Sequence, residues 1–131
     1  MKLNFLLTCN SINQTQTGLD IQGVFDSIGS KDFPAIHPSM LIVANLEVKE
    51  EEQNKSYLES FKILFEDKVI LEDQTTFESK GPRHQFVHKI EKIVLEKPGR
   101  YDIQILIGEK IIGESYFTAR QISVDTPPQI R

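Results

Sequence analysis

Residues 98–107 read PGRYDIQILI, in which a turn signal is followed at once by a strand pattern. Pro98 presets the backbone of the second turn position, and Gly99 supplies the positive φ that a type II turn needs at the third. After the turn, apolar and polar residues alternate, which places one set of side chains on each face of a strand. This stretch therefore predicts a half-buried β-strand that begins at a sharp reversal. Its apolar set is Tyr101, Ile103, Ile105 and Ile107.

The same alternation recurs upstream in two segments. Between Met40 and Val48 every second residue is apolar, and the intervening positions become polar toward the end of the run. The run from Phe61 to Phe65 alternates in the same way with Ser60 and Lys62. Because a period of two is the signature of a half-buried strand, both segments predict strands with one face in a core.

The links between strand-like runs predict how the strands pair. Residues 66–68 and 108–110 are polar and short enough for hairpins, so their flanking strands should pair antiparallel. We also expect Leu3–Thr8 to pair with Leu19–Ile28 across the polar, strand-poor segment 10–18. About eight short strands at this spacing predict an all-β fold, an antiparallel β-sandwich of about seven or eight strands, immunoglobulin-like or similar.

Tyr101 bears on the kind of sandwich. Its place just after the Pro98-Gly99 turn is reminiscent of the tyrosine that ties a corner in immunoglobulin-like domains, where its hydroxyl bonds to upstream backbone. The alternative is that Tyr101 only covers one edge of the core. Both interpretations keep its ring against the core.

One segment, 84–96, fits two kinds of structure. Phe86, Ile90, Ile93 and Val94 fall at helical spacing, whereas Val87, Ile93 and Leu95 share the parity of a strand. We favour a strand, because Ile93-Val94-Leu95 is rich in β-prone residues and Pro98-Gly99 stops the run soon afterwards.

Length and composition set the broad class. The 131 residues suit a single domain over 1–131, with 120–131 as a C-terminal tail. One cysteine excludes an intrachain disulfide, and no apolar run reaches the roughly 18 residues of a membrane span, so we expect a cytoplasmic protein without a membrane partner. The net charge of −4 opposes general attraction to nucleic acid, which is not expected as a partner.

Three stretches resemble a family of short bacterial proteins known only as a domain of unknown function. They are 18–26 (GLDIQGVFD), 33–38 (FPAIHP) and 97–101 (KPGRY), and the resemblance spans roughly Leu6 to Ala119. It implies a cytoplasmic bacterial β-sandwich. It carries over no catalytic residue.

The three histidines, His37, His84 and His88, are the natural candidates for metal binding or acid–base chemistry. On a helix His84 and His88 would lie close enough to share an ion, but on a strand they stand about 13 Å apart, at roughly 3.3 Å per residue. The strand interpretation therefore predicts ordinary histidines and no metal site. The basic group of Lys80, Arg83, His84, His88, Lys89 and Lys92 is diluted by acids and indicates a solvated face.

A candidate binding loop lies between the two prolines of residues 33–38. Pro34 and Pro38 stiffen the backbone, so the segment suits one wall of a pocket at an end of the sandwich. The plainer interpretation is that Phe33 and Ile36 plug the core while His37 bonds to local backbone. The candidate loop consists of Phe33, Pro34, Ile36, His37 and Pro38.

No residue pattern supports catalysis or a cofactor. Cys9 ends an apolar run without a neighbouring nucleophile motif, which indicates a partly buried, inert thiol. Adjacent acids such as Glu66-Asp67 are typical of solvated strand ends, and phosphate-binding glycine motifs are absent. We therefore expect no catalytic, cofactor-binding or metal-binding residues and no cofactor.

The leading functional hypothesis is a non-enzymatic module that binds another protein, of unknown identity. An exposed edge strand, either Leu3–Thr8 or the strand ending near Ala119, would accept a partner strand. Two alternatives stay open: a small metal-dependent or histidine-based hydrolase, and a structural subunit of an oligomeric assembly. The sequence does not fix the oligomeric state.

Overall fold

A computed structural model describes residues 1–123 of the chain as ten β-strands and one short 3-10 helix, with no α-helix in that part of the chain. The expected all-β class is confirmed, and the strand count exceeds the seven or eight anticipated. In chain order the elements are β1 (Lys2–Cys9), β2 (Ser11–Gln14), β3 (Leu19–Gln22), β4 (Ser27–Ser30), β5 (Ala35–Glu47), η1 (Glu50–Glu52), β6 (Ser56–Phe65), β7 (Lys68–Glu78), β8 (Arg83–Leu95), β9 (Gly99–Ile107) and β10 (Lys110–Gln121).

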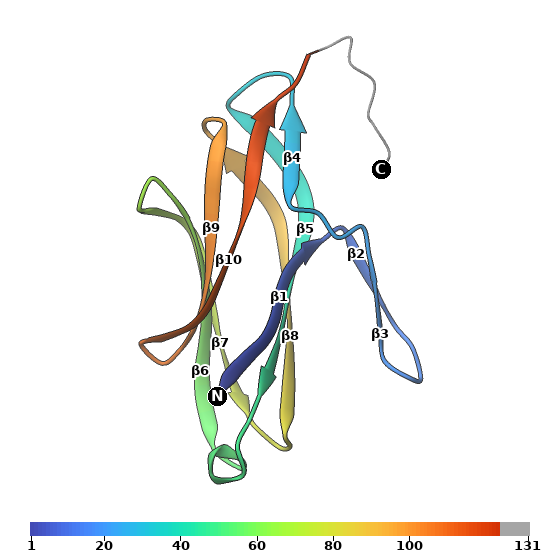
Figure 1. Cartoon of the computed structure of the whole chain (residues 1–131), viewed down its shortest axis with the longest axis vertical. Helices are drawn as coiled ribbons and strands as arrows, with labels where there is room; N and C mark the ends of the chain where they lie inside the picture. The colour runs from blue at the N-terminus through green and yellow to red at the C-terminus, as the bar shows by residue number, and fades with distance from the viewer. Residues whose placement is uncertain (124–131) are drawn as a thin grey trace.

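Two sheets face one another across a shared core (Figure 1). The smaller has the order β1-β5-β8 and the larger β4-β10-β9-β6-β7, while β2 and β3 form a separate hairpin that projects from the body. Every pair is antiparallel except β4 with β10, which is parallel, so the larger sheet is mixed and the expectation of a wholly antiparallel arrangement is corrected. Along one side β1 approaches β10, and Leu3 packs over Gly113.

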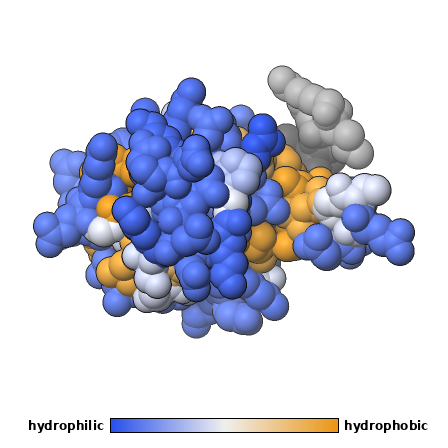
Figure 2. All heavy atoms as spheres, turned by 90° about the horizontal axis from the view of Figure 1, so that it is seen from below, coloured by the Kyte–Doolittle hydropathy of each residue, from blue (hydrophilic) through white to orange (hydrophobic). Residues whose placement is uncertain are grey.

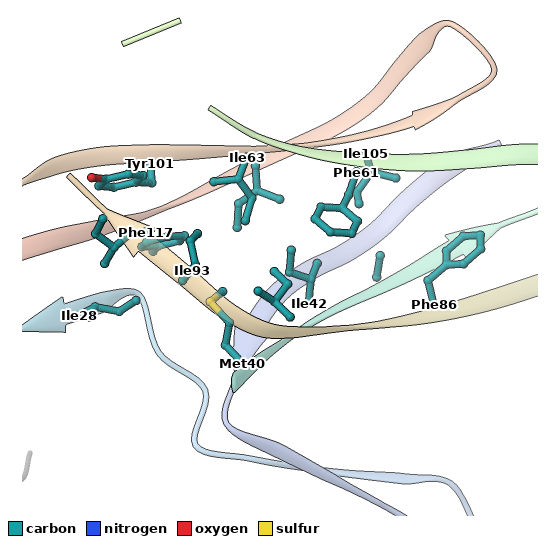
Figure 3. Packing of buried hydrophobic residues seen from close by; sticks show 14 of the residues in the cluster. Ile28, Met40, Ile42, Phe61, Ile63, Phe86, Ile93, Tyr101, Ile105 and Phe117 are labelled. Carbon is teal, nitrogen blue, oxygen red and sulfur yellow. The ribbon is translucent and has the colours of Figure 1, made fainter. Parts of the chain in front are cut away.

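The core is filled from both sheets (Figure 3). Met40, Ile42 and Phe86 point inward from the smaller sheet toward Phe61 and the aromatic pair of the larger one. That pair, Tyr101 and Phe117, is stacked with ring centroids 5.3 Å apart. Because strand side chains alternate, each of these residues belongs to the apolar parity of its own strand.

The chain bends at Lys97 and Pro98 as predicted, but the φ of Gly99 exceeds the roughly +80° that a type II turn has at its third position. Gly99 has a φ of +145°, in the region that favours glycine, and Tyr101 is fully buried. The Tyr101 hydroxyl donates to the Lys97 carbonyl at 2.7 Å, so the tyrosine both fills the core and ties the turn to the strand that follows. Burial is the main cause of the raised pKa of this tyrosine.

Local pairings were predicted more accurately than distant ones. The loops at 66–67 and 108–109 are two-residue hairpin turns, as expected from their length. The expected pairing of Leu3–Thr8 with Leu19–Ile28 is wrong: β1 pairs with β5, and only an isolated bridge joins Thr8 to Phe25. The polar segment 10–18 was expected to lack strands, but Ser11–Gln14 pairs with β3 and forms β2.

Residues 84–96 form β8, apart from Glu96, so the strand interpretation is confirmed. The mixed periodicity has a structural cause. The buried positions change parity between Ile90 and Ile93, where Glu91 and Lys92 are both exposed. The neighbouring β5 changes parity at the same level, at Pro38 and Ser39. An alternation that shifts by one residue in mid-strand imitates helical spacing.

The C-terminal tail was placed too early. Residues up to Gln121 belong to β10, where Ala119 to Gln121 pair with β4, and the rest of the expected tail from 124 onward lies outside the described residues. No helix among residues 1–123 is long and apolar enough to cross a membrane.

Candidate functional site

A buried acid–imidazole pair joins the two sheets. Glu59 of β6 and His88 of β8 meet with Oε2 and Nε2 2.8 Å apart, which is a hydrogen-bond distance. The Glu59 side chain has no solvent exposure, and that of His88 is 12% exposed. Since the two residues come from opposite sheets, their bond ties β6 to β8 across the core.

Aromatic rings surround this pair. The ring of Phe61 lies 4.7 Å from that of His88, and the ring of Phe86 stacks with it at 6.0 Å. His84 stacks on Phe77 at 4.3 Å. Desolvation lowers the pKa of His84, and the charge of Glu59 opposes that shift only in part. The apolar setting strengthens any charge interaction inside it, because the local dielectric is low.

The second oxygen of Glu59 is unsatisfied. Its Oε1 atom is buried and has no hydrogen-bond partner among residues 1–123. A buried acceptor without a partner costs roughly 1–3 kcal/mol, and more when charged. Such atoms are rare in folded proteins, so Oε1 marks a position where another polar group would be stabilised.

The chemistry available here is limited. His84 and His88 both face inward, but Phe86 lies between them on β8, as expected for residues four apart on a strand. Within the described part of the chain, no three His, Cys, Asp or Glu side chains are grouped as a metal ion requires. Cys9 belongs to a second apolar cluster, with Leu41 and Val43, and burial raises the pKa of its thiol.

That second cluster lies on the outer face of the smaller sheet. Leu41 and Val43 of β5 are buried there because the β2–β3 hairpin lays Ile12 and Ile21 over them. Viewed from below, the molecule shows apolar surface between its body and the projecting hairpin (Figure 2). The hairpin therefore gives β5 a covered outer face, which β8 lacks.

Only part of the candidate binding segment 33–38 lies in a loop, because its second half belongs to β5. Phe33 packs against the core as expected, but Ile36 is 64% exposed and does not plug it. Ile36, His37 and Pro38 lie in β5 and pair with β8, so they form strand rather than loop. Pro38 is tolerated because β1 reaches only to Leu41, which leaves this part of β5 paired on one side.

His37 does not bond to local backbone as anticipated. Its Nε2 atom is buried without a hydrogen-bond partner in residues 1–123, beside the ring of Phe25 at 5.9 Å. Desolvation lowers the pKa of His37 below its ordinary value of 6.5. The folded chain therefore favours the neutral imidazole.

This shift makes stability depend on pH. The contribution of neutral His37 is fully present above pH 6.5 and is lost as the pH falls below it, because the unfolded chain takes up the proton first. In His37→Phe we expect the fall in unfolding free energy between pH 7.5 and 5.5, measured by urea denaturation, to be smaller than in the unchanged chain. An equal fall in both proteins would contradict the assignment.

Beside the acid–imidazole pair, one edge of the smaller sheet is open. Within residues 1–123, β8 pairs with β5 and with no strand on its other side. Its outward-facing Val87 is 39% exposed, and Gln85 and Lys89 on the same face are exposed too. We call the stretch from Gln85 to Val94 the β8 edge.

Opposite this edge, the larger sheet is uncovered. Asp73 and Thr75 of β7 pair with Phe61 and Glu59 of β6, and directly paired residues face the same side of a sheet. Both therefore face the space between the sheets, yet both are exposed. The smaller sheet ends at β8, so nothing described covers β7 at this level.

The edge strands differ from those suggested by the sequence. Leu3–Thr8 is an edge of its sheet, but β10 lies near its other side. The strand ending near Ala119 is interior at its end, between β9 and β4.

The basic group expected on one solvated face is divided between the two faces of β8: Arg83 and Lys89 face outward, while His84 and His88 face inward.

Glu59 was missed by sequence reasoning although a signal existed. It lies two residues before Phe61, on the same parity as Phe61 and Ile63. A charged residue on the apolar parity of a strand is expected to be buried and to need a partner from another strand.

Residues 4–120 match a family described as "Family of unknown function (DUF6941)". No curated protein matches the chain.

Proposed function

The chain belongs to the family of unknown function that matches residues 4–120, and we propose from its own geometry that it is a non-enzymatic protein-interaction module. Its partner supplies an extended segment that pairs with the β8 edge as an added strand. The observation that carries this proposal is the mismatch between the sheets: β8 has a free edge directly opposite the uncovered inner face of β7.

Strand addition suits the β8 edge better than the outer edge of β7, the other long edge strand. A strand added at β8 would lie over Asp73 and Thr75 and gain a buried face, whereas a strand added outside β7 would have no sheet opposite it. Main-chain bonds to a free edge supply affinity, and pockets for alternate side chains supply specificity. The two layers and the bond from Tyr101 to Lys97 support an immunoglobulin-like sandwich as the scaffold.

The test uses photo-cross-linking residues placed one at a time at Gln85, Val87 and Lys89, in cells that make the protein. All three positions face outward from β8 at intervals of two residues. We expect all three to capture the same protein, at partner residues that also step by two. Tyr116, a comparably exposed residue on β10, is the matched control position and should not capture it.

A second copy of the chain is the main competing occupant. Native mass spectrometry of the purified protein separates the two: a monomer of 15.0 kDa leaves the β8 edge open for a different protein. A dimer that dissociates in Val87→Lys, but not in Tyr116→Lys, would contradict binding of a different protein and assign the edge to self-assembly.

A further inference from the structure

The space beside the β8 edge has an acidic character that constrains what could enter it. Glu59 is fully buried and has one oxygen without a partner. Asp73 is exposed on the same inner face of the larger sheet, and its Oδ1 accepts a hydrogen bond from the Gln74 amide at 2.8 Å. His88 already bonds the other oxygen of Glu59 and offers nothing to Oε1. The inner face of the larger sheet thus carries two carboxyl groups here, of which only Glu59 is bonded to His88.

The geometry of an added strand brings a side chain to this position. A partner residue paired with His88 would face inward with it and stand over Thr75, which is paired with Glu59. Neighbouring strands are about 4.8 Å apart and facing sheets about 10 Å apart, so the long side chain of Lys or Arg spans the gap to both carboxyl groups. A short or acidic side chain would leave Oε1 unsatisfied.

The outer face of the added strand has a different neighbour. Val87 and Val94 are each 39% exposed on the outer side of β8. Residues of a partner strand that face outward would pack beside them, and apolar cross-strand pairs stabilise such pairings. The inner face of the β8 edge therefore favours a basic side chain, and its outer face favours an apolar one.

We infer that the bound segment alternates basic and apolar residues, with Lys or Arg facing Glu59 and Asp73 and the apolar set beside Val87. This inference rests on strand addition at the β8 edge. The cation satisfies Oε1 and offsets the carboxylate charge, while the apolar residues extend the outer face of the smaller sheet. An interaction of this kind confers specificity, because an acidic segment would place like charges together in a water-poor space.

The test uses two synthetic peptides, TKVKVKT and TEVEVET, each acetylated and amidated. Binding is measured by NMR titration, with β8 amide shifts as the readout. We expect the lysine peptide to bind at least about 10-fold more tightly, which corresponds to about 1.4 kcal/mol. Glu59→Gln and Asp73→Asn should each reduce that preference several-fold, whereas Glu114→Gln, an exposed acid on β10, should leave it unchanged.

The outcomes separate this inference from the proposed function. Equal binding of both peptides at β8, or a lysine preference unaffected by Glu59→Gln and Asp73→Asn, would overturn the basic segment while leaving strand addition in place. Failure of both peptides to shift any β8 amide would overturn strand addition itself. Asp73→Asn changes an exposed side chain, so it remains informative even if Glu59→Gln fails to fold.

Discussion

Replacing His88 with phenylalanine is expected to lower the free energy of unfolding by about 3 kcal/mol. The substitution keeps a ring beside Phe61 and Phe86 but removes the only hydrogen-bond partner that Glu59 has in residues 1–123. The carboxyl group would then be buried with both oxygens unsatisfied, at zero exposure. Urea denaturation at pH 7 measures the loss.

The double variant Glu59→Leu with His88→Phe is the control for this result. It removes the buried acid together with its partner, and replacing a buried polar pair by apolar residues of similar size is often neutral or stabilising. We expect it to recover most of the stability that the single variant loses. A double variant as unstable as His88→Phe would show that the ring does not fit at position 88, and would contradict the role assigned to the pair.

Gly99→Ala is expected to destabilise the chain by about 2–3 kcal/mol. Gly99 has a positive φ, and a Cβ placed there would stand 2.9 Å from the Phe65 ring. That ring stacks on Tyr101 at 4.5 Å, so it cannot move without disturbing the tyrosine that ties the turn. Thermal unfolding followed by circular dichroism measures the change.

Gly81→Ala provides the matched comparison. Gly81 does not have a positive φ between +20° and +160°, and nothing lies within 4 Å of a Cβ built on it. We expect its replacement to change stability by less than about 0.5 kcal/mol. If the two glycine variants were equally stable, the turn at Pro98-Gly99 would not organise the fold as described.

The parts of the fold that could be predicted from sequence are those set by local patterns. The alternation after Tyr101 and the two-residue loops at 66–67 and 108–109 are recorded in consecutive residues, and the structure confirms the strands and hairpins they indicate. The β1–β5 pairing and the parallel β4–β10 pairing join residues far apart in the chain. No local pattern specifies which of several apolar strands will be neighbours.

The candidate site illustrates the same limit. Sequence reasoning named His84 and His88 and separated them correctly on a strand, but the partner of His88 lies 29 residues away on the opposite sheet. The sequence does show a charged residue, Glu59, among the apolar positions of its strand. Its partner can be identified only once β6 is known to face β8. The free edge of β8 is a property of sheet order, and a single sequence does not encode sheet order in any short motif.

Amide hydrogen exchange of β8, measured with and without the protein captured at Val87, tests strand addition most directly. In the free chain, every second amide of β8 should exchange quickly, because β5 bonds only one side of the strand. With the partner bound, we expect those same amides to become protected. Binding that protects another surface, such as the β2–β3 hairpin, and leaves the fast amides of β8 unchanged would contradict the account.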